Sequence, residues 1–153
     1  MQRKYLLVFG AGAAAILAAA LFVLWDPALV YDSHIASTRS ISVDGIALRV
    51  AVVDTPLTRQ QGLSNIPSLK PDEGMLFIFE EDGQYSFWMK DMALSIDILW
   101  ITSSGRVVFI EHSVSPETYP RAFTPDLPAR YVLEVPAGFA TEHGIGVGSK
   151  VTF

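Results

Sequence analysis

The N-terminal part of the chain divides into an apolar run and a polar stretch. Residues 5–25 carry no charge, are rich in Ala, Leu, Val and Phe, and follow the basic pair Arg3 and Lys4. A run of this length matches the roughly 20 apolar residues that cross a bilayer as a helix. Residues 26–39 have no sustained periodicity, so they predict a linker before a domain at 40–153.

The apolar run predicts a retained signal anchor, because it is longer than the roughly 7 to 15 residues of a signal-peptide core. No Ala-x-Ala cleavage site follows Trp25. The basic pair keeps residues 1–4 in the cytoplasm under the positive-inside rule. We therefore expect a single-pass inner-membrane protein with a periplasmic C-terminal domain. Cleavage of the segment, with secretion to the periplasm, is the alternative.

Within the domain, short segments of alternating or continuous apolar residues predict strands. Asp44-Gly45 is typical of a two-residue hairpin turn. Thr55-Pro56 is typical of a helix start, and Gly62 of a helix end. The predicted strands are 40–43, 46–53, 75–79, 85–90, 95–102, 106–113, 130–135 and 149–153, the predicted helices 57–61 and 137–143, and the predicted loops 64–74 and 115–128.

The connections between these segments indicate the architecture. Short connections from residue 75 to residue 113 predict an antiparallel meander, and the continuous apolar run 75–79 predicts a strand buried on both faces. We expect an α+β fold that is mainly antiparallel β. It is a small barrel-like or sandwich domain with one or two short helices, preceded by one transmembrane helix.

Charge and cysteine content exclude several classes of function. The chain has 16 Asp and Glu against 11 Lys and Arg, and two of those basic residues precede the apolar run. An acidic domain is a poor match for nucleic acid, which needs a basic face. The chain has no cysteine, which removes disulfides, thiolate metal sites and thiol nucleophiles.

Side-chain alternation along the strands places charged residues among apolar neighbours. Asp97 lies between Ile96 and Ile98, and Glu134 lies between Leu133 and Val135. Partly buried charges need partners, so one interpretation pairs Arg49, Arg59 or Lys90 with Asp97 or Glu134. The other interpretation is a polar pocket at one end of the barrel. The candidate binding surface consists of Arg59, Trp88, Lys90, Asp97 and Glu134.

Two further chemistries are compatible with the residues. The thioethers of Met75, Met89 and Met92 could bind a cuprous ion, although methionines on strands more often fill a core. A small envelope hydrolase would use Asp97 or Glu134 as its acid or base. The three histidines lack the spacing of a zinc helix, and no serine lies in a Gly-x-Ser-x-Gly motif.

Several motifs occur together in an order that resembles a known family. They are Arg59-Gln60-Gln61-Gly62-Leu63, Gly74-Met75-Leu76-Phe77, Phe87-Trp88-Met89-Lys90-Asp91-Met92, residues 94–98, and Tyr131-Val132-Leu133-Glu134-Val135 with Ala137-Gly138. Over roughly residues 41–153 the chain resembles the domain of unknown function family 192 (DUF192). The resemblance implies a compact β-rich domain, commonly exported or membrane-anchored, with no established activity. The positions that match its recurrent residues are Arg59, Gly74, Trp88, Met89, Lys90, Asp97 and Glu134.

These observations favour a membrane-anchored binding or accessory module of the cell envelope over an enzyme, because no complete catalytic set is recognisable. Its expected partners are the inner membrane, through residues 5–25, and an envelope ligand or protein of unknown identity. We expect no cofactor, no resident metal and no nucleic acid.

Overall fold

The computed structural model describes residues 37–153. The predicted signal anchor and most of the predicted linker lie outside the described residues. Across 37–153, every helix is too short or too polar to cross a membrane. The first strand begins at Ser37, so the last three residues assigned to the linker belong to the sheet.

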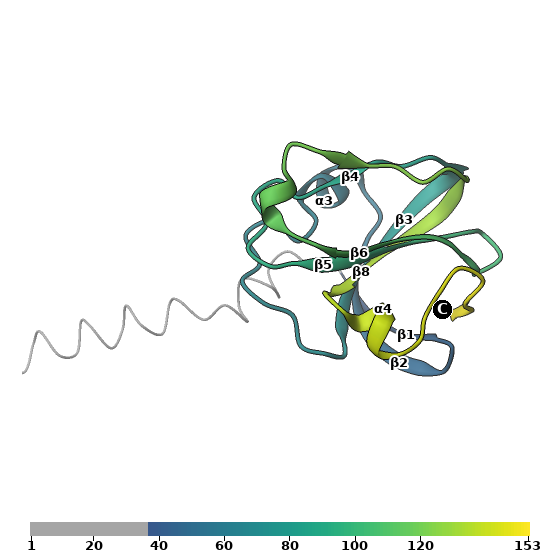
Figure 1. Cartoon of the computed structure of the whole chain (residues 1–153). Coiled ribbons are helices and arrows are strands. Elements are labelled where there is room, and N and C mark those ends of the chain that lie inside the picture. Colours follow the sequence, from purple (N-terminus) through teal and green to yellow (C-terminus); the bar gives the residue numbers. More distant parts are fainter. Residues whose placement is uncertain (1–36) are drawn as a thin grey trace, which may run out of the picture.

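A curled seven-stranded sheet forms the frame of the domain (Figure 1). Its strand order is β6-β5-β8-β3-β2-β1-β9. The two edges meet where Arg106 pairs with Lys150, and the amide of Val107 donates to the carbonyl of Ser149 at 3.0 Å. The strands are β1 (Ser37–Val43), β2 (Ile46–Val53), β3 (Glu73–Gly83), β5 (Ile96–Ile101), β6 (Val107–Val114), β8 (Ala129–Pro136) and β9 (Val151–Thr152).

Short elements cover this frame. Strands β4 (Phe87–Trp88) and β7 (Ala122–Phe123) pair with each other in a small second sheet. The helices are α3 (Pro56–Gln61), the 3₁₀ turn η1 (Pro116–Thr118) and α4 (Phe139–Glu142). In the view of Figure 1, α3 and β4 lie above β5 and β8, and α4 lies below them. The prediction of a mainly antiparallel, barrel-like domain with short helices is confirmed.

Local sequence signals explain the first elements. Strands β1 and β2 form the predicted hairpin, in which Asp44 and Gly45 both have positive φ angles, 47° and 87°. Helix α3 begins as predicted, because the Thr55 hydroxyl accepts from the amide of Thr58 and the Thr58 hydroxyl accepts from the amide of Thr55. Gly62 closes the helix with its amide bonded to the carbonyl of Thr58 at 3.0 Å.

The predicted meander is wrong in part. Of the strands between residues 75 and 113, only β5 and β6 pair with each other. Strand β3 lies instead between β2, to which it is parallel, and β8. A parallel pair needs a long crossover, and the connection that contains α3 provides it. The segment predicted as strand 85–90 leaves the main sheet and pairs with β7 as a second layer.

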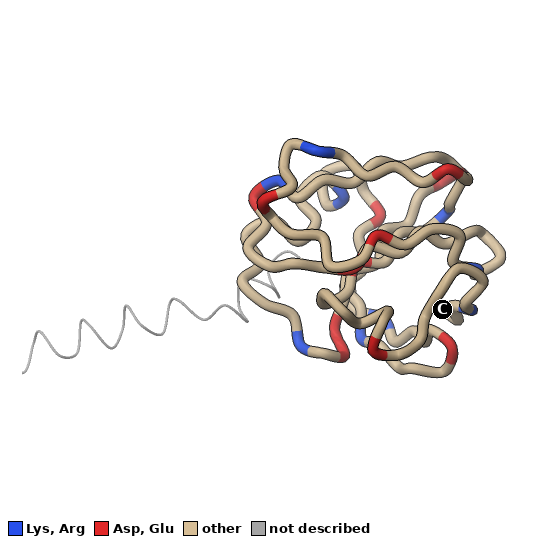
Figure 2. Tube along the Cα trace, in the orientation of Figure 1, with Lys and Arg blue, Asp and Glu red and all other residues tan. Residues whose placement is uncertain are grey.

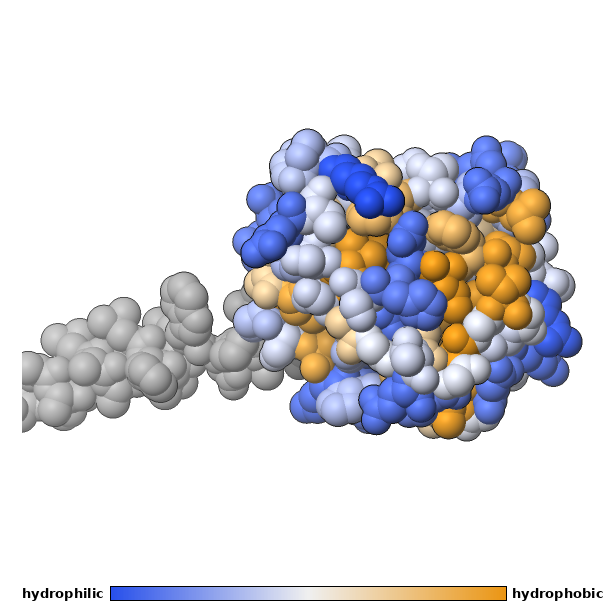
Figure 3. Space-filling view, in the orientation of Figure 1, coloured by the Kyte–Doolittle hydropathy of each residue, from blue (hydrophilic) through white to orange (hydrophobic). Residues whose placement is uncertain are grey.

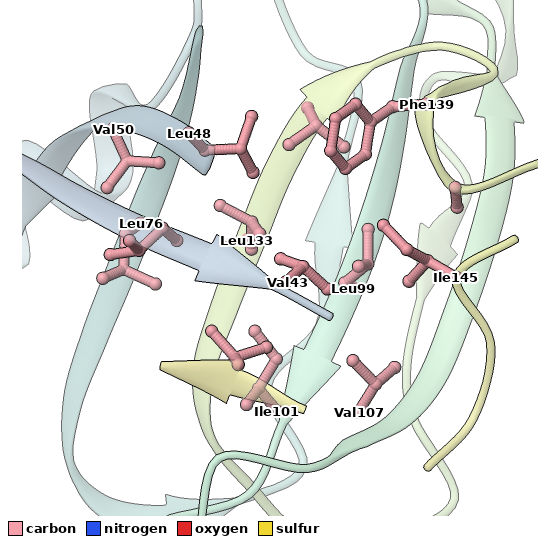
Figure 4. Packing of buried hydrophobic residues seen from close by; sticks show 14 residues of the cluster. Val43, Leu48, Val50, Leu76, Leu99, Ile101, Val107, Leu133, Phe139 and Ile145 are labelled. Carbon is pink, nitrogen blue, oxygen red and sulfur yellow. The ribbon is translucent and has the colours of Figure 1, made fainter. Parts of the chain in front are cut away.

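Alternation along the strands gives the domain two cores, one on each face of the main sheet. The first lies inside the curl, where Leu76, Leu99 and Leu133 meet Phe139 and other aliphatic residues (Figure 4). The second lies on the opposite face, where residues such as Phe77 and Trp100 are covered by the layer of the 62–72 loop, β4 and β7. The second layer leaves a cavity between itself and the sheet.

Candidate functional site

A cavity of about 280 Å³ opens between α3, β3 and the chain segment around β4. Residues 85–88 and the aromatic residues of β3 form its walls, and its exposed lining residues, among them Gln60 and Trp88, mark its mouth. Its lining residues are Pro56, Arg59, Gln60, Gln61, Gly62, Leu63, Ser64, Phe77, Phe79, Tyr85, Ser86, Phe87, Trp88, Lys90, Met92 and Glu134.

Aromatic rings in mutual contact build the walls of the cavity. The Tyr85 ring stacks on Phe79 with centroids 3.5 Å apart, and Phe87 meets Phe77 edge to face at 4.8 Å. The indole N–H of Trp100, buried beneath them, donates to the carbonyl of Tyr85 at 2.8 Å. These contacts fix the rings before any ligand arrives, so an apolar group can enter without ordering them.

Arg59 is held at the mouth by the backbone. Its Nη1 donates to the carbonyl of Asp54 at 2.6 Å and to that of Ile78 at 2.7 Å. The guanidinium carbon lies 5.0 Å from the centre of the Phe79 ring, a distance that suits a cation–π contact. Within residues 37–153 this side chain forms no ion pair, so its charge is available to a ligand.

Two loops with left-handed backbone conformations are joined beside the cavity. The Ser64 hydroxyl donates to the carbonyl of Lys90 at 3.0 Å, and the amide of Asn65 donates to that of Asp91 at 2.8 Å. Asn65 and Asp91 have φ angles of 63° and 57°, which cost energy in residues other than glycine. Lys90 is thereby held at the rim, exposed and without an ion pair among the described residues.

Glu134 contributes the acidic group of the lining. It is only 4% exposed, and its Oε2 has no hydrogen-bond partner in the described structure. Its strand neighbours, Met75 on β3 and Ile98 on β5, are apolar. Burial raises the pKa of Glu134 to about 8, because a charged carboxylate is poorly solvated there. At neutral pH the group is therefore largely a neutral acid that can donate a hydrogen bond.

Gly74 allows the backbone of β3 to approach β8 at this point. A Cβ atom on Gly74 would lie 2.6 Å from the carbonyl oxygen of Glu134. The obstruction would come from backbone rather than from a flexible side chain, so any larger residue would displace Glu134 or its strand.

Asp97 lies on the other face of the sheet and outside the cavity. It is fully buried, and its carboxylate accepts from the amides of Ser113 at 2.7 Å, Gly138 at 3.1 Å and Ala140 at 2.8 Å. These three bonds join β5 to the end of β6 and to the start of α4. The carboxylate therefore fixes the backbone around it rather than facing a ligand.

The proposed pairing of Arg49, Arg59 or Lys90 with Asp97 or Glu134 is wrong. Arg49 forms its ion pair with Glu73, the residue beside it on the neighbouring parallel strand β3. Lys70 also contacts Glu73, at 3.1 Å. The sequence pattern predicts a loop at residue 73, whereas β3 already begins there, so the pattern does not indicate this ion pair.

The three methionines lie in or beside the second core. Met75 and Met89 are 1% exposed and pack among apolar side chains, and Met92 packs against the same cluster and lines the cavity. Among residues 37–153, His, Asp and Glu form no group of three or more that could hold a metal ion. The cuprous alternative depends on sulfur ligands and stays a prediction.

Four of the five predicted surface residues, Arg59, Trp88, Lys90 and Glu134, line this one cavity, and Asp97 does not. The sequence pattern does not identify the walls, in particular Phe79 and Tyr85. The only available signal was the series of aromatic residues along 77–88, which predicted strands and a core without indicating which rings would face a cavity.

The comparisons with known proteins identify the family. Residues 39–153 match the model of the family DUF192, described as "Uncharacterized ACR, COG1430". The chain belongs to the DUF192 family. No match was found among curated proteins.

Two crystal structures resemble this DUF192 protein over most of its length. One, from Sinorhizobium meliloti 1021, is provisionally described as a transcription regulator; it has 29% identity and a TM-score of 0.73, covering 77% of this chain and 95% of that one. The other, from Novosphingobium aromaticivorans DSM 12444, is described as a protein of unknown function. It has 26% identity and a TM-score of 0.72, covering 76% of this chain and 85% of that one.

Proposed function

We propose that this DUF192 protein is a membrane-anchored module of the cell envelope that binds a small ligand in the cavity between α3, β3 and β4. The observation that supports it best is a preformed aromatic cavity that contains a buried carboxyl group, Glu134, with an unpartnered oxygen. Buried polar groups are normally hydrogen-bonded, so an unpartnered one in a cavity is a candidate contact for a ligand.

The surface is consistent with a pocket rather than with a broad apolar docking face. On the side shown in Figure 3, hydrophobic residues gather mainly on the right-hand half of the domain and are bordered by hydrophilic ones. Trp88, at the mouth, is 54% exposed and its ring contacts Tyr119 at 6.4 Å between centroids. An exposed indole beside a cavity is a suitable contact for an entering ligand.

Nucleic acid is not the proposed ligand, although one structural neighbour is described as a regulator of transcription. Lys and Arg are scattered singly along the trace of the domain instead of forming a basic stripe (Figure 2). The formal net charge of the chain is −5. A protein that neutralises several phosphates needs a concentrated basic face.

The test is a thermal-shift screen of the full-length protein against metals, glycans, peptides and small organic acids and amines. A ligand that binds only the folded state raises the melting temperature. The decisive variant is Gln60→Trp, which fills the mouth, and its control is Leu57→Trp on the same helix, outside the lining and 74% exposed. A hit that survives Gln60→Trp as well as Leu57→Trp would contradict the proposal.

The membrane anchor is tested separately by fractionation of cells that express the full-length chain. We expect the protein in the membrane fraction, with the domain digested by protease only after the outer membrane has been opened. Recovery from the cytoplasmic fraction would contradict this part of the proposal.

A hydrolase that uses Glu134 as general acid is the second candidate, favoured by the raised pKa of Glu134 inside a cavity. Of the two carboxyl groups considered, Asp97 is already bonded to three backbone amides. The candidate predicts turnover of chromogenic esters or glycosides that Glu134→Gln abolishes. Equal rates for both proteins would contradict it.

A further inference from the structure

We propose that the cavity recognises an organic anion, such as a carboxylate on an aromatic or aliphatic body, through the cations of Arg59 and Lys90 and a hydrogen bond to the carboxyl group of Glu134. This inference rests on the proposed ligand-binding function and adds the chemical class of the ligand.

The charged side chains of the lining favour an anion. Arg59, Lys90 and Glu134 are its only residues with a formally charged side chain when ionised near neutral pH. Within residues 37–153 neither cation has an acidic partner. Each therefore keeps its charge free for a ligand. With Glu134 neutral, the lining is positive, and it attracts an anion and repels an ammonium group.

The unpartnered oxygen of Glu134 also favours an anionic ligand. A buried carboxyl that stays neutral has one O–H donor, and its Oε2 has no acceptor or donor beside it in the described structure. A ligand carboxylate supplies an acceptor of high charge, and a hydrogen bond to an ionised acceptor is stronger than one between neutral groups. A neutral ligand would give a weaker bond at the same place.

The walls determine the size and the apolar character of the uncharged part of the ligand. Tyr85 stacked on Phe79, and Phe87 against Phe77, present rings that are already fixed in position. The volume of about 280 Å³ lies just below the range of small-molecule sites, roughly 300 to 1,000 Å³. The cavity therefore suits one ring or a short chain rather than an oligomer.

The neighbours of Glu134 determine the pH dependence. The titratable groups that share the cavity with it are Arg59 from α3, and Tyr85 and Lys90 from the segment around β4. The residues paired with Glu134 on β3 and β5, Met75 and Ile98, carry no charge. Ionisation of Glu134 removes its hydrogen-bond donor and adds a negative charge to the cavity, and both changes disfavour an anion. Anion affinity should fall about tenfold per pH unit above the pKa of Glu134.

The experiment uses three probes of similar shape on ¹⁵N-labelled full-length protein: phenylacetate, phenethylamine and 2-phenylethanol. Binding is followed at pH 7 through the indole N–H signal of Trp88. We expect phenylacetate to bind at least about tenfold more tightly than 2-phenylethanol, which lacks the charge, and phenethylamine to bind most weakly.

Two variants test the residues. Lys90→Met should weaken phenylacetate several-fold and leave 2-phenylethanol unchanged, whereas Lys150→Met, an exposed lysine outside the lining, should change neither. Glu134→Gln keeps a donor but cannot ionise, so its affinity for phenylacetate should stay constant at alkaline pH while that of the wild type falls. Lys90→Met keeps the test valid if Glu134→Gln fails to fold.

The outcomes separate this inference from the function on which it rests. Preference for phenethylamine, or equal binding of phenylacetate and 2-phenylethanol, would contradict the inference that the ligand is an anion. The cavity would still be a ligand-binding site. If none of the three probes binds, the inference that the ligand is an anion is also contradicted. The proposed function then stands or falls on the thermal-shift screen and its Gln60→Trp variant.

Discussion

Two buried acidic residues lie on neighbouring strands of the same sheet and have opposite surroundings. Asp97 on β5 pairs with Val135, and Glu134 on β8 pairs with Ile98, so their side chains point to opposite faces. Asp97 receives three backbone amide donors. The Oε2 of Glu134 receives none within the described residues, and Glu134 lines a cavity.

The difference shows that burial alone does not give a carboxyl group its role. Donors from the backbone satisfy Asp97, which makes it part of the framework. Glu134 lacks such donors, and the energetic cost of burying it falls on its charged form. An apolar residue at this position would avoid the energetic cost of burying an acid. The presence of an acid there makes the position a candidate for function.

The largest expected effect is the loss of stability when Asp97 is replaced. Asp97→Ala leaves the amides of Ser113, Gly138 and Ala140 without an acceptor, which should lower the free energy of unfolding by about 4 kcal/mol. Urea denaturation measures it. Asp126→Ala, at an exposed position, is the matched control. A loss equal to that of the control would mean that Asp97 does not hold the backbone.

A smaller effect is expected from disturbing Glu134 through its neighbour. Gly74→Ala places a Cβ 2.6 Å from the carbonyl oxygen of Glu134 and should cost about 2 kcal/mol in the free energy of unfolding. Gly146→Ala is the control, since a Cβ there meets nothing within 4 Å. If both variants were equally stable, the close approach of β3 to β8 at Glu134 would be refuted.

The third expected effect is a pH dependence of the free energy of unfolding. The pKa of Glu134 is raised from 4.5 to about 8 in the folded state, so between these pH values the folded chain binds more protons than the unfolded one. The free energy of unfolding of the wild type should therefore fall as pH rises through this window. The additional slope due to Glu134 is at most about 1.4 kcal/mol per pH unit, and it ends above the folded pKa.

Glu134→Gln should remove this component of the slope, because glutamine does not titrate. Denaturation of both proteins at pH 5, 6, 7 and 8 checks it. Parallel curves for wild type and variant would show that Glu134 ionises as readily in the folded protein as in the unfolded chain, and the comparison with Asp97 would lose its basis.

Side-chain alternation was sufficient to predict much of the framework. It assigned Asp97 and the residues at 96, 98 and 100 to opposite faces of one strand, and the two cores follow that division. The turn at Asp44-Gly45 and the helix start at Thr55 depend on local backbone chemistry, so they could also be predicted.

Long-range pairing could not be predicted in the same way. The crossover that makes β2 and β3 parallel places Arg49 beside Glu73, and nothing in the local sequence indicates that register. The same limit applies to the cavity. Arg59, Trp88, Lys90 and Glu134 were candidates because they are polar or aromatic residues in a suitable context, whereas their common cavity depends on the second layer that forms when β4 pairs with β7.

The protonation of Glu134 in the folded protein tests the account most directly. In ¹³C-labelled full-length protein, the side-chain carboxyl signal that Glu134→Gln removes identifies this group. The account predicts a titration midpoint of about 8, with a further rise when phenylacetate is added. A midpoint near the ordinary value of 4.5, unchanged by phenylacetate, would contradict it.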